Sequence, residues 1–311
     1  MFHHVKELQF DAKVSKPDPR FASLLLDQFG GPNGELKAAM QYFTQAFTVR
    51  RSYPKEYDML MDIATEEFSH LEIVGATITM LLDGVNSELK DAAESSDLAK
   101  LMTGAGAKDS VMNAAFTSPQ FLIRSGGGPT VTDCQGVPWN GFFVNAEGDL
   151  TVDLRSNIAA EARAKIVYEY LLKFTDDPEV KQTLGFLMTR EIAHSQMFTA
   201  ALDNIEPNFP PGVRQGDPRF THAYFNLSDG KETRGPWNKG RGPWADGEEW
   251  VYVDDPIEDV RRTAGLTQHP TAGSRKTPDE LKKLEQQLSR RRSQETKTPA
   301  SGVQRWSARE S

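Results

Sequence analysis

The sequence is poor in cysteine. Its 311 residues contain one, Cys134. A single thiol cannot form a disulfide within the chain, which excludes a disulfide-stapled scaffold and is typical of a protein from a reducing compartment. It also excludes an iron site that takes four cysteines from one chain, as a rubredoxin-type electron-transfer module does. We therefore expect a cytoplasmic protein.

Long hydrophobic runs are also missing. Hydrophobic residues make up 38% of the chain and the mean hydropathy is −0.54, and no apolar segment approaches the roughly 20 residues that span a membrane. The first six residues lack the basic and then apolar pattern of a signal peptide. The formal net charge is −8, which disfavours nucleic acid as the main partner. We expect neither a membrane nor a nucleic acid as a partner.

What the sequence does contain is a repeated set of glutamates and histidines. Two Glu-x-x-His motifs occur, and a lone glutamate lies 32 residues before the first motif and 30 residues before the second. The six residues are Glu35, Glu67, His70, Glu161, Glu191 and His194. Because residues three apart share one helix face, each motif can offer an oxygen and a nitrogen to one metal ion.

The hydrophobic pattern predicts that these polar residues face a core. Glu67 and His70 continue an apolar stripe with the period of a helix, and Glu191 and His194 continue another. The lone glutamates interrupt similar stripes. Isolated buried carboxylates cost many kcal/mol, so four of them converging on one core require cations. Two divalent metal ions would supply that charge.

Four long helices are predicted, over residues 34–52, 54–82, 153–176 and 178–204. Pro54 and Pro178 suit the first turn of their helices, and Asn33 can cap the first one. A long connection over residues 84–152 joins the second helix to the third. This pattern predicts an all-α, ferritin-like four-helix bundle with a long crossover, because such bundles hold two metals with a lone Glu from two helices and Glu-x-x-His from the other two.

The chain divides into four parts. We expect an N-terminal arm (1–33), the bundle (34–206), an irregular extension that wraps the surface (207–270) and a charged, flexible tail (271–311). From residue 274 to the end the tail has ten Lys and Arg against five Asp and Glu, a local charge of +5.

Shorter elements are predicted within these parts. A short helix is expected at 21–28 in the arm, strand-like pieces are expected at 130–132 and 141–144 in the crossover, and a charged helix is expected at 277–292 in the tail.

Four local sequences around the glutamates and histidines are also distinctive. They are Gly34-Glu35 followed by Tyr42, the segment Ala64–Glu72, Val167–Glu169 followed by Thr175–Pro178, and His194. Together they resemble the non-haem manganese catalases, over roughly residues 1–230. The resemblance implies an enzyme that disproportionates hydrogen peroxide to water and oxygen, assembled as a homohexamer.

Carried over position by position, the resemblance implies two manganese ions per chain. Their ligands would be Glu35, Glu67, His70, Glu161 and His194. Glu67 and His70 would serve one ion. Glu161 and His194 would serve the other, with Glu35 as the bridge.

Further residues follow from the same resemblance. Glu191 would be a proton-transfer base near the metals and not a ligand. Tyr42 could hydrogen-bond a metal ligand or simply fill the core. Some relatives carry a basic residue just before the third-helix glutamate, where this chain has Ala160. Oxygen and imidazole ligands suit manganese but also iron, so a ferritin-like di-iron oxidase or a metal-storage protein remains the alternative.

A second set of oxygen donors predicts a calcium ion. Asp58 and Asp62 lie one helical turn apart, and a polar loop contains Asn226, Ser228 and Gly230. Hard oxygen ligands of this kind suit calcium, and some manganese catalases are similar in pairing two such aspartates with such a loop. Without the loop, the two aspartates would be read as a solvated acidic face. We expect one calcium ion per chain.

Overall fold

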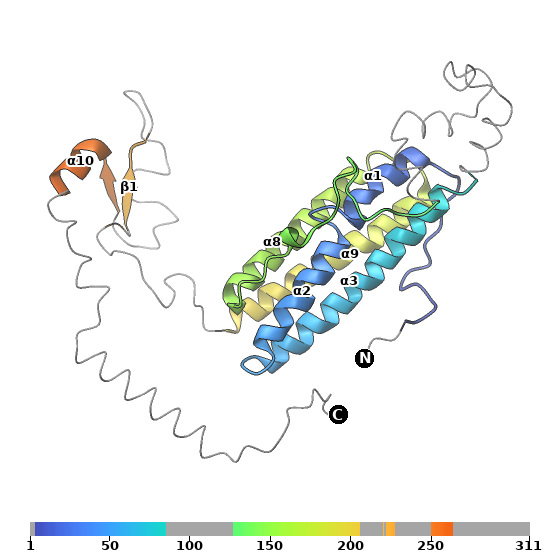
Figure 1. The fold of residues 1–311 in the computed structure, drawn as a ribbon, viewed down its shortest axis with the longest axis horizontal. Coiled ribbons are helices and arrows are strands. Elements are labelled where there is room, and N and C mark those ends of the chain that lie inside the picture. The colour runs from blue at the N-terminus through green and yellow to red at the C-terminus, as the bar shows by residue number, and fades with distance from the viewer. Residues whose placement is uncertain (1–3, 85–126, 206–219, 221, 228–249, 264–311) are drawn as a thin grey trace, which may run out of the picture. The chain divides into compact units, whose positions relative to one another are not determined.

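The computed structural model describes residues 4–84, 127–205, 220, 222–227 and 250–263 (Figure 1). The chain forms two compact units, Met1–Phe209 and Pro210–Ser311. The elements of the first unit are α1 (Pro19–Phe29), α2 (Glu35–Val49), α3 (Pro54–Leu81), the 3-10 turn η1 (Gly141–Phe143), α8 (Leu150–Leu171) and α9 (Pro178–Asp203).

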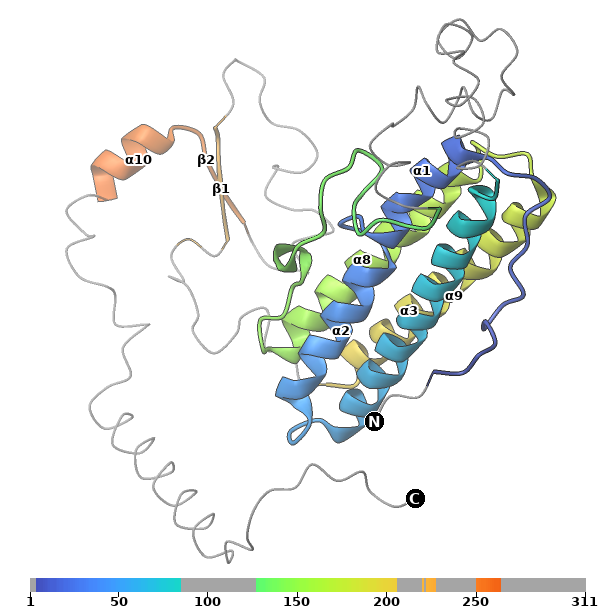
Figure 2. The same ribbon diagram turned by 45° about the vertical axis from the view of Figure 1, so that its right-hand side comes forward.

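The first unit is a four-helix bundle. Helices α2 and α3 pack as one hairpin, α8 and α9 pack as a second, and the hairpins meet through α2 with α8 and α3 with α9. Figures 1 and 2 show these four helices side by side, with α1 against one end of the bundle. The predicted all-α architecture is confirmed. None of the described helices is both long and apolar enough to cross a membrane.

The helix boundaries follow local capping chemistry. The Asp149 carboxylate accepts hydrogen bonds from the backbone of Thr151 and Val152, so α8 begins at Leu150, earlier than expected. It ends at Leu171, before the expected position 176. Asp177 caps α9 in the same way, and Pro178 occupies the first turn.

The expected cap at Asn33 is wrong. Gly34 is the N-cap of α2 and makes no side-chain hydrogen bond. The Asn33 amide oxygen instead accepts a hydrogen bond of 3.0 Å from the Arg163 guanidinium on α8. Asn33 therefore connects the start of α2 to the opposite hairpin.

Two apolar clusters fill the bundle, one on each side of the polar residues of α3. The first includes Leu25, Ile78 and Leu184, and the second includes Leu60 and Phe198. All five side chains are fully buried, and burial of each stabilises the fold by about 1.5–3 kcal/mol. The ionisable residues thus form a polar layer between two dry layers.

A buried amide network holds the crossover against the bundle. The Asn157 side chain on α8 accepts hydrogen bonds from Gln41 at 2.8 Å and Gln45 at 2.9 Å, both on α2, and donates one back to Gln45. Gln41 and Gln45 also bond the backbone of Asn145 in the crossover. The end of the crossover is therefore bonded directly to α2, and Asn157 links the same two glutamines to α8.

The strand expected at 141–144 is wrong. Residues 141–143 form η1, because the Asn140 side chain accepts a hydrogen bond from the Phe142 backbone and turns the chain. Near residue 130 there is a single antiparallel bridge, between Thr132 and Pro138, and no full strand among the described residues of the crossover.

The second unit contains regular structure where we expected an irregular extension. Strand β1 (Ala223–Phe225) pairs in parallel with β2 (Val251–Val253), and α10 (Pro256–Thr263) follows. The Tyr224 ring stacks on Trp250 beside this pair. The helix expected at 277–292, like the whole tail, lies outside the described residues.

Candidate metal centre

The six residues of the repeated motifs meet inside the bundle. Their exposed fractions are 0–1%. Helix α2 contributes Glu35 at its first residue, and α8 contributes Glu161 from its middle. Helices α3 and α9 contribute the two Glu-x-x-His motifs. The sequence pattern therefore placed all six residues correctly in the polar layer of the core.

These residues form two adjoining groups. One group is Glu35, Glu67, His70 and Glu191, and the other is Glu67, Glu161, Glu191 and His194. Within each group the nearest oxygen and nitrogen atoms all lie within 4.8 Å of one another. Each group is large enough to surround one metal ion, and Glu67 and Glu191 belong to both.

Glu67 lies between the two imidazoles. One of its carboxylate oxygens is 3.1 Å from Nδ1 of His70, and the other is 2.8 Å from Nδ1 of His194. Glu35 approaches only His70, with its Oε2 3.7 Å from Nδ1. Glu67 therefore contacts both histidines and belongs to both groups, whereas Glu35, the expected bridge, belongs to one.

Both imidazoles turn Nδ1 toward the carboxylates of the core. The rings stack, with their centroids 5.5 Å apart and an interplanar angle of 20°. Their Nε2 atoms face the other way, toward Glu66 of α3. Glu66 lies 3.0 Å from Nε2 of His194 and 3.6 Å from Nε2 of His70.

Two tyrosines hold the lone glutamates in a reciprocal arrangement. The hydroxyl of Tyr42 on α2 donates to Glu161 on α8 at 2.5 Å. The hydroxyl of Tyr168 on α8 donates to Glu35 on α2. Each tyrosine lies seven residues after the lone glutamate of its own helix. Of the two alternatives for Tyr42, the structure shows the hydrogen bond to a predicted ligand, and Tyr168 is its counterpart in the other half.

The electrostatics reflect a crowd of buried acids. Burial and the charge of Glu67 raise the pKa of Glu35 to about 7 and that of Glu161 to about 8. Burial and the charges of Glu35 and Glu67 raise the pKa of Glu191 well above its ordinary value. Without further positive charge, the site therefore holds protons on carboxyl groups.

The histidines behave in the opposite sense. Burial lowers the pKa of His194, but the hydrogen bonds to Glu66 and Glu67 outweigh burial and bring the value to about 9. The pKa of His70 is also raised, because its contacts with Glu35, Glu66 and Glu67 outweigh burial. The two imidazoles are thus held in a strongly anionic environment.

Several oxygens of the centre have no hydrogen-bond partner among the described residues. They are Oε2 of Glu35, Oε2 of Glu161 and both oxygens of Glu191. Buried polar atoms are normally paired, since an unpaired one costs about 1–3 kcal/mol. Unpaired carboxylate oxygens that face imidazole nitrogens are a set of donors that fits two divalent cations.

Sequence reasoning missed some residues of the centre. Glu66 was missed because it is next to Glu67 in the sequence but lies on a different face of the helix. Tyr168 was noted only within the segment Val167–Glu169, with no role of its own. Lys37 is 2% exposed, and its Nζ has no hydrogen-bond partner within the described part of the chain. Burial and the charge of Arg163 lower the pKa of Lys37 to about 8.

The predicted calcium ligands are only partly described. Asp58 and Asp62 lie on α3, and both side chains are exposed. Asn226 belongs to the second unit, where its amide donates to the backbone of Asp254. Ser228 and Gly230 lie outside the described residues. The calcium site stays a prediction.

The chain is similar to proteins of known type along most of its length. A family model described as "Manganese containing catalase" matches residues 1–290. A probable manganese catalase of Clostridium acetobutylicum is 40% identical over 232 residues, which cover 73% of this chain and 91% of that protein. A manganese catalase of Bacillus subtilis is 35% identical over 263 residues, covering 82% and 91%.

A solved structure agrees with these sequence matches. The crystal structure of wild-type KatB, a manganese catalase from Anabaena, is 39% identical, covers 82% of this chain and 100% of its own, and superposes with a TM-score of 0.65. The ligand types alone left open whether the metal is manganese or iron, and the family match favours manganese. The chain, with its two adjoining carboxylate and histidine groups, belongs to the manganese catalase family.

Proposed function

We propose that the chain disproportionates hydrogen peroxide to water and oxygen at two manganese ions. Glu35, Glu67 and His70 would hold one ion. Glu67, Glu161 and His194 would hold the other. The observation that carries this proposal is the position of Glu67, with one oxygen directed at Nδ1 of each histidine.

The donor set suits the reaction. One peroxide gives up two electrons and two protons as it becomes oxygen, and a second peroxide takes both up as it becomes two waters. Two manganese ions, when bound, would supply this two-electron store by alternating between the +2 and +3 states, and oxygen and imidazole ligands suit manganese. The protein has to hold the ligands in place and move the protons.

Glu191 is the residue we assign to proton transfer. It is fully buried, its Oε1 is 3.7 Å from Nδ1 of His70, and neither of its oxygens has a hydrogen-bond partner among the described residues. A buried carboxylate with unbonded oxygens beside the proposed ligands suits a group that takes a proton from one peroxide and returns it to the next. Tyr42 and Tyr168 hold Glu161 and Glu35, whereas no tyrosine in the described part of the chain bonds Glu191.

The assembly and location of the protein belong to the same proposal. The family resemblance supports a homohexamer, and the single cysteine supports the cytoplasm. Light scattering coupled to size exclusion measures the assembly directly: a mass of one 34.7 kDa chain would contradict an oligomer.

The purified protein is expected to evolve oxygen from hydrogen peroxide without haem. Elemental analysis should give about two manganese per chain, as in other bundles with a two-metal site, and the visible spectrum should lack a Soret band. Oxygen release is measured with an oxygen electrode. A preparation that holds two manganese per chain and leaves peroxide unchanged would rule out the catalase function.

Ligands and the proton-transfer residue should respond differently to substitution. His70→Ala and His194→Ala should each lose bound manganese, whereas Glu191→Gln should keep both ions and lose about 10²–10⁴-fold in kcat. His4→Ala is the matched control, because His4 pairs with Glu72 on the surface of α3. If Glu191→Gln loses its metal as fully as His194→Ala does, Glu191 is a ligand.

The metal-free protein should become less stable as the pH rises from 5 to 8. In the folded chain Glu35 and Glu161 bind protons up to about pH 7 and 8, but in the unfolded chain only up to about 4.5. A group whose folded pKa is raised stabilises the fold below its unfolded pKa, and this contribution is lost as the pH passes the folded value. The raised pKa of His194 acts in the same direction above pH 6.5.

Bound manganese should reverse the dependence of stability on pH. Metal binding displaces protons from the carboxylates and histidines, so affinity for the metal rises with pH. Melting temperatures at pH 5.5 and pH 8.0, with and without manganese, measure both effects. The metal-free melt should fall by at least about 3 °C while the loaded melt rises. A metal-free melt that rises over this interval would contradict the raised carboxyl pKa values.

We also propose one calcium ion per chain, held by Asp58, Asp62, Asn226, Ser228 and Gly230. The support is the pair of exposed aspartates one turn apart on α3 and the oxygen-rich loop.

Calcium should raise the melting temperature of the chelator-treated protein. Binding stabilises the folded form by about 2.7 kcal/mol at a hundredfold excess over Kd. Asp58→Ala should abolish the response. Asp83→Ala, which removes another exposed acid near the end of α3, should leave it intact. An unchanged wild-type melt would mean that Asp58 and Asp62 are a solvated face.

A further inference from the structure

The carboxylate of Glu66 faces Nε2 of both histidines, on the side of the rings away from the core carboxylates. Glu66 lies one position before Glu67 on α3, so its side chain points about 100° away around the helix. Its Oε2 is 3.0 Å from Nε2 of His194, and its Oε1 is 3.6 Å from Nε2 of His70. One carboxylate therefore faces the rings that belong to two different metal ions.

Two further residues fix Glu66 in this position. Arg190 on α9 donates from Nε to Oε1 at 2.6 Å and from a terminal nitrogen to Oε2 at 3.2 Å. This two-point contact sets the plane of the carboxylate. Gln9 of the N-terminal arm donates its amide to Oε1 at 2.8 Å. The side chain of Glu66 is 20% exposed, so it is at the edge of the core.

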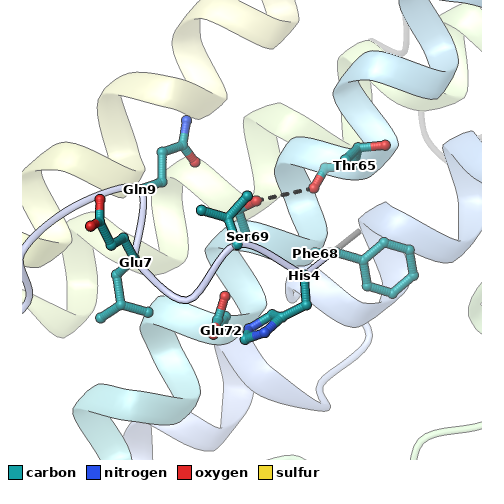
Figure 3. A pocket seen from close by; sticks show the side chains of 9 residues that line it. His4, Glu7, Gln9, Thr65, Phe68, Ser69 and Glu72 are labelled. Atoms are coloured by element: carbon teal, nitrogen blue, oxygen red, sulfur yellow. Dashed lines mark hydrogen bonds and ion pairs between the residues drawn. The ribbon is translucent and has the colours of Figure 1, made fainter. Parts of the chain in front are cut away.

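Gln9 also borders the outside of the molecule. It lines a pocket of about 680 Å³ between the arm and the outer face of α3. Figure 3 shows Gln9 and His4 of the arm together with Thr65, Ser69 and Glu72 of the helix. The contacts from this pocket inward run from Gln9 to Glu66 and from Glu66 to the histidines. The arm thus reaches the metal centre through one carboxylate.

We propose that Glu66 is a positioning residue for both metal-binding histidines, held by Arg190 and Gln9. It accepts the Nε2 proton of His194 and attracts that of His70, which leaves each Nδ1 free of a proton and directed at a metal ion. The proposal rests on the function assigned above. It adds a single anion that orients the ligands of both ions.

The physical reason lies in the tautomers of histidine. A neutral imidazole carries its proton on one nitrogen and offers a lone pair on the other, and a partner for the proton decides which nitrogen binds the metal. A carboxylate in this position also makes the ring a better donor to the metal. Loss of such an outer partner lowers metal affinity by about 10–100-fold in other metal sites.

The two rings are not held equally. The distance to His194 is that of a hydrogen bond, whereas the distance to His70 exceeds one. Removal of the Glu66 charge should therefore weaken the binding of the ion at His194 more than the binding of the ion at His70. The two manganese affinities should therefore fall by different factors in the variant.

The test compares Glu66→Gln with Glu72→Gln. Glu72 lies on the same helix and also contacts a histidine, but that histidine is His4 of the arm, away from the metal centre. Manganese affinity is measured by competition with a metal indicator, and melts of the metal-free proteins report folding. We expect Glu66→Gln to lose about 10–100-fold in affinity for at least one ion, with Glu72→Gln unchanged.

Cobalt supplies a spectroscopic readout that a purely structural role would not change. The ligand-field absorption of cobalt-loaded protein reports the orientation of its histidine ligands, so it should differ in Glu66→Gln and stay the same in Glu72→Gln. Arg190→Lys should lose less manganese affinity than Glu66→Gln does, and Gln9→Leu should lose less than Arg190→Lys. They keep the test decisive if Glu66→Gln does not fold.

The outcomes separate the two proposals. Manganese affinity and cobalt absorption that match the wild type in Glu66→Gln would overturn the role of Glu66, and the catalase function would be unaffected. Wild-type protein that binds two manganese but does not act on peroxide would overturn the catalase function. The role of Glu66 would still be measured by affinity alone.

Discussion

The burial of four carboxylates in one layer of the bundle is the constraint on which the rest of the structure depends. Taken alone, each of these groups would avoid the core or hold a proton there, as the raised pKa values of Glu35 and Glu161 illustrate. Two divalent cations remove the conflict. The apolar clusters on both sides lower the local dielectric, so the charges of the ions would act more strongly on the carboxylates than in water.

The bundle meets this constraint by using one design twice. Each hairpin contributes a lone glutamate, a tyrosine seven residues later, and a Glu-x-x-His motif. Each tyrosine bonds the glutamate of the other hairpin, so neither half of the centre is complete by itself. Because these bonds cross between α2 and α8, the geometry of the metal ligands depends on the packing of the two hairpins and not on either one.

The sequence predicted the bundle and its six inward residues because both depend on helical period. A charged residue inside an apolar stripe is visible in one dimension, as at Glu67 and His70. The helical period of the sequence gives no distances between helices. It therefore could not reveal that Glu67, and not Glu35, lies between the histidines. Glu66 was missed because a glutamate outside the stripe has the pattern of a surface residue.

The repeat also shows where the two halves differ. Glu66 and Arg190 each stand one residue before the glutamate of their Glu-x-x-His motif, so they occupy equivalent positions with opposite charge. Two glutamates there would repel each other, and two arginines would leave the histidines without an acceptor. One of each forms a bonded pair that serves both rings. The departure from symmetry is thus what allows one residue to act on both metal sites.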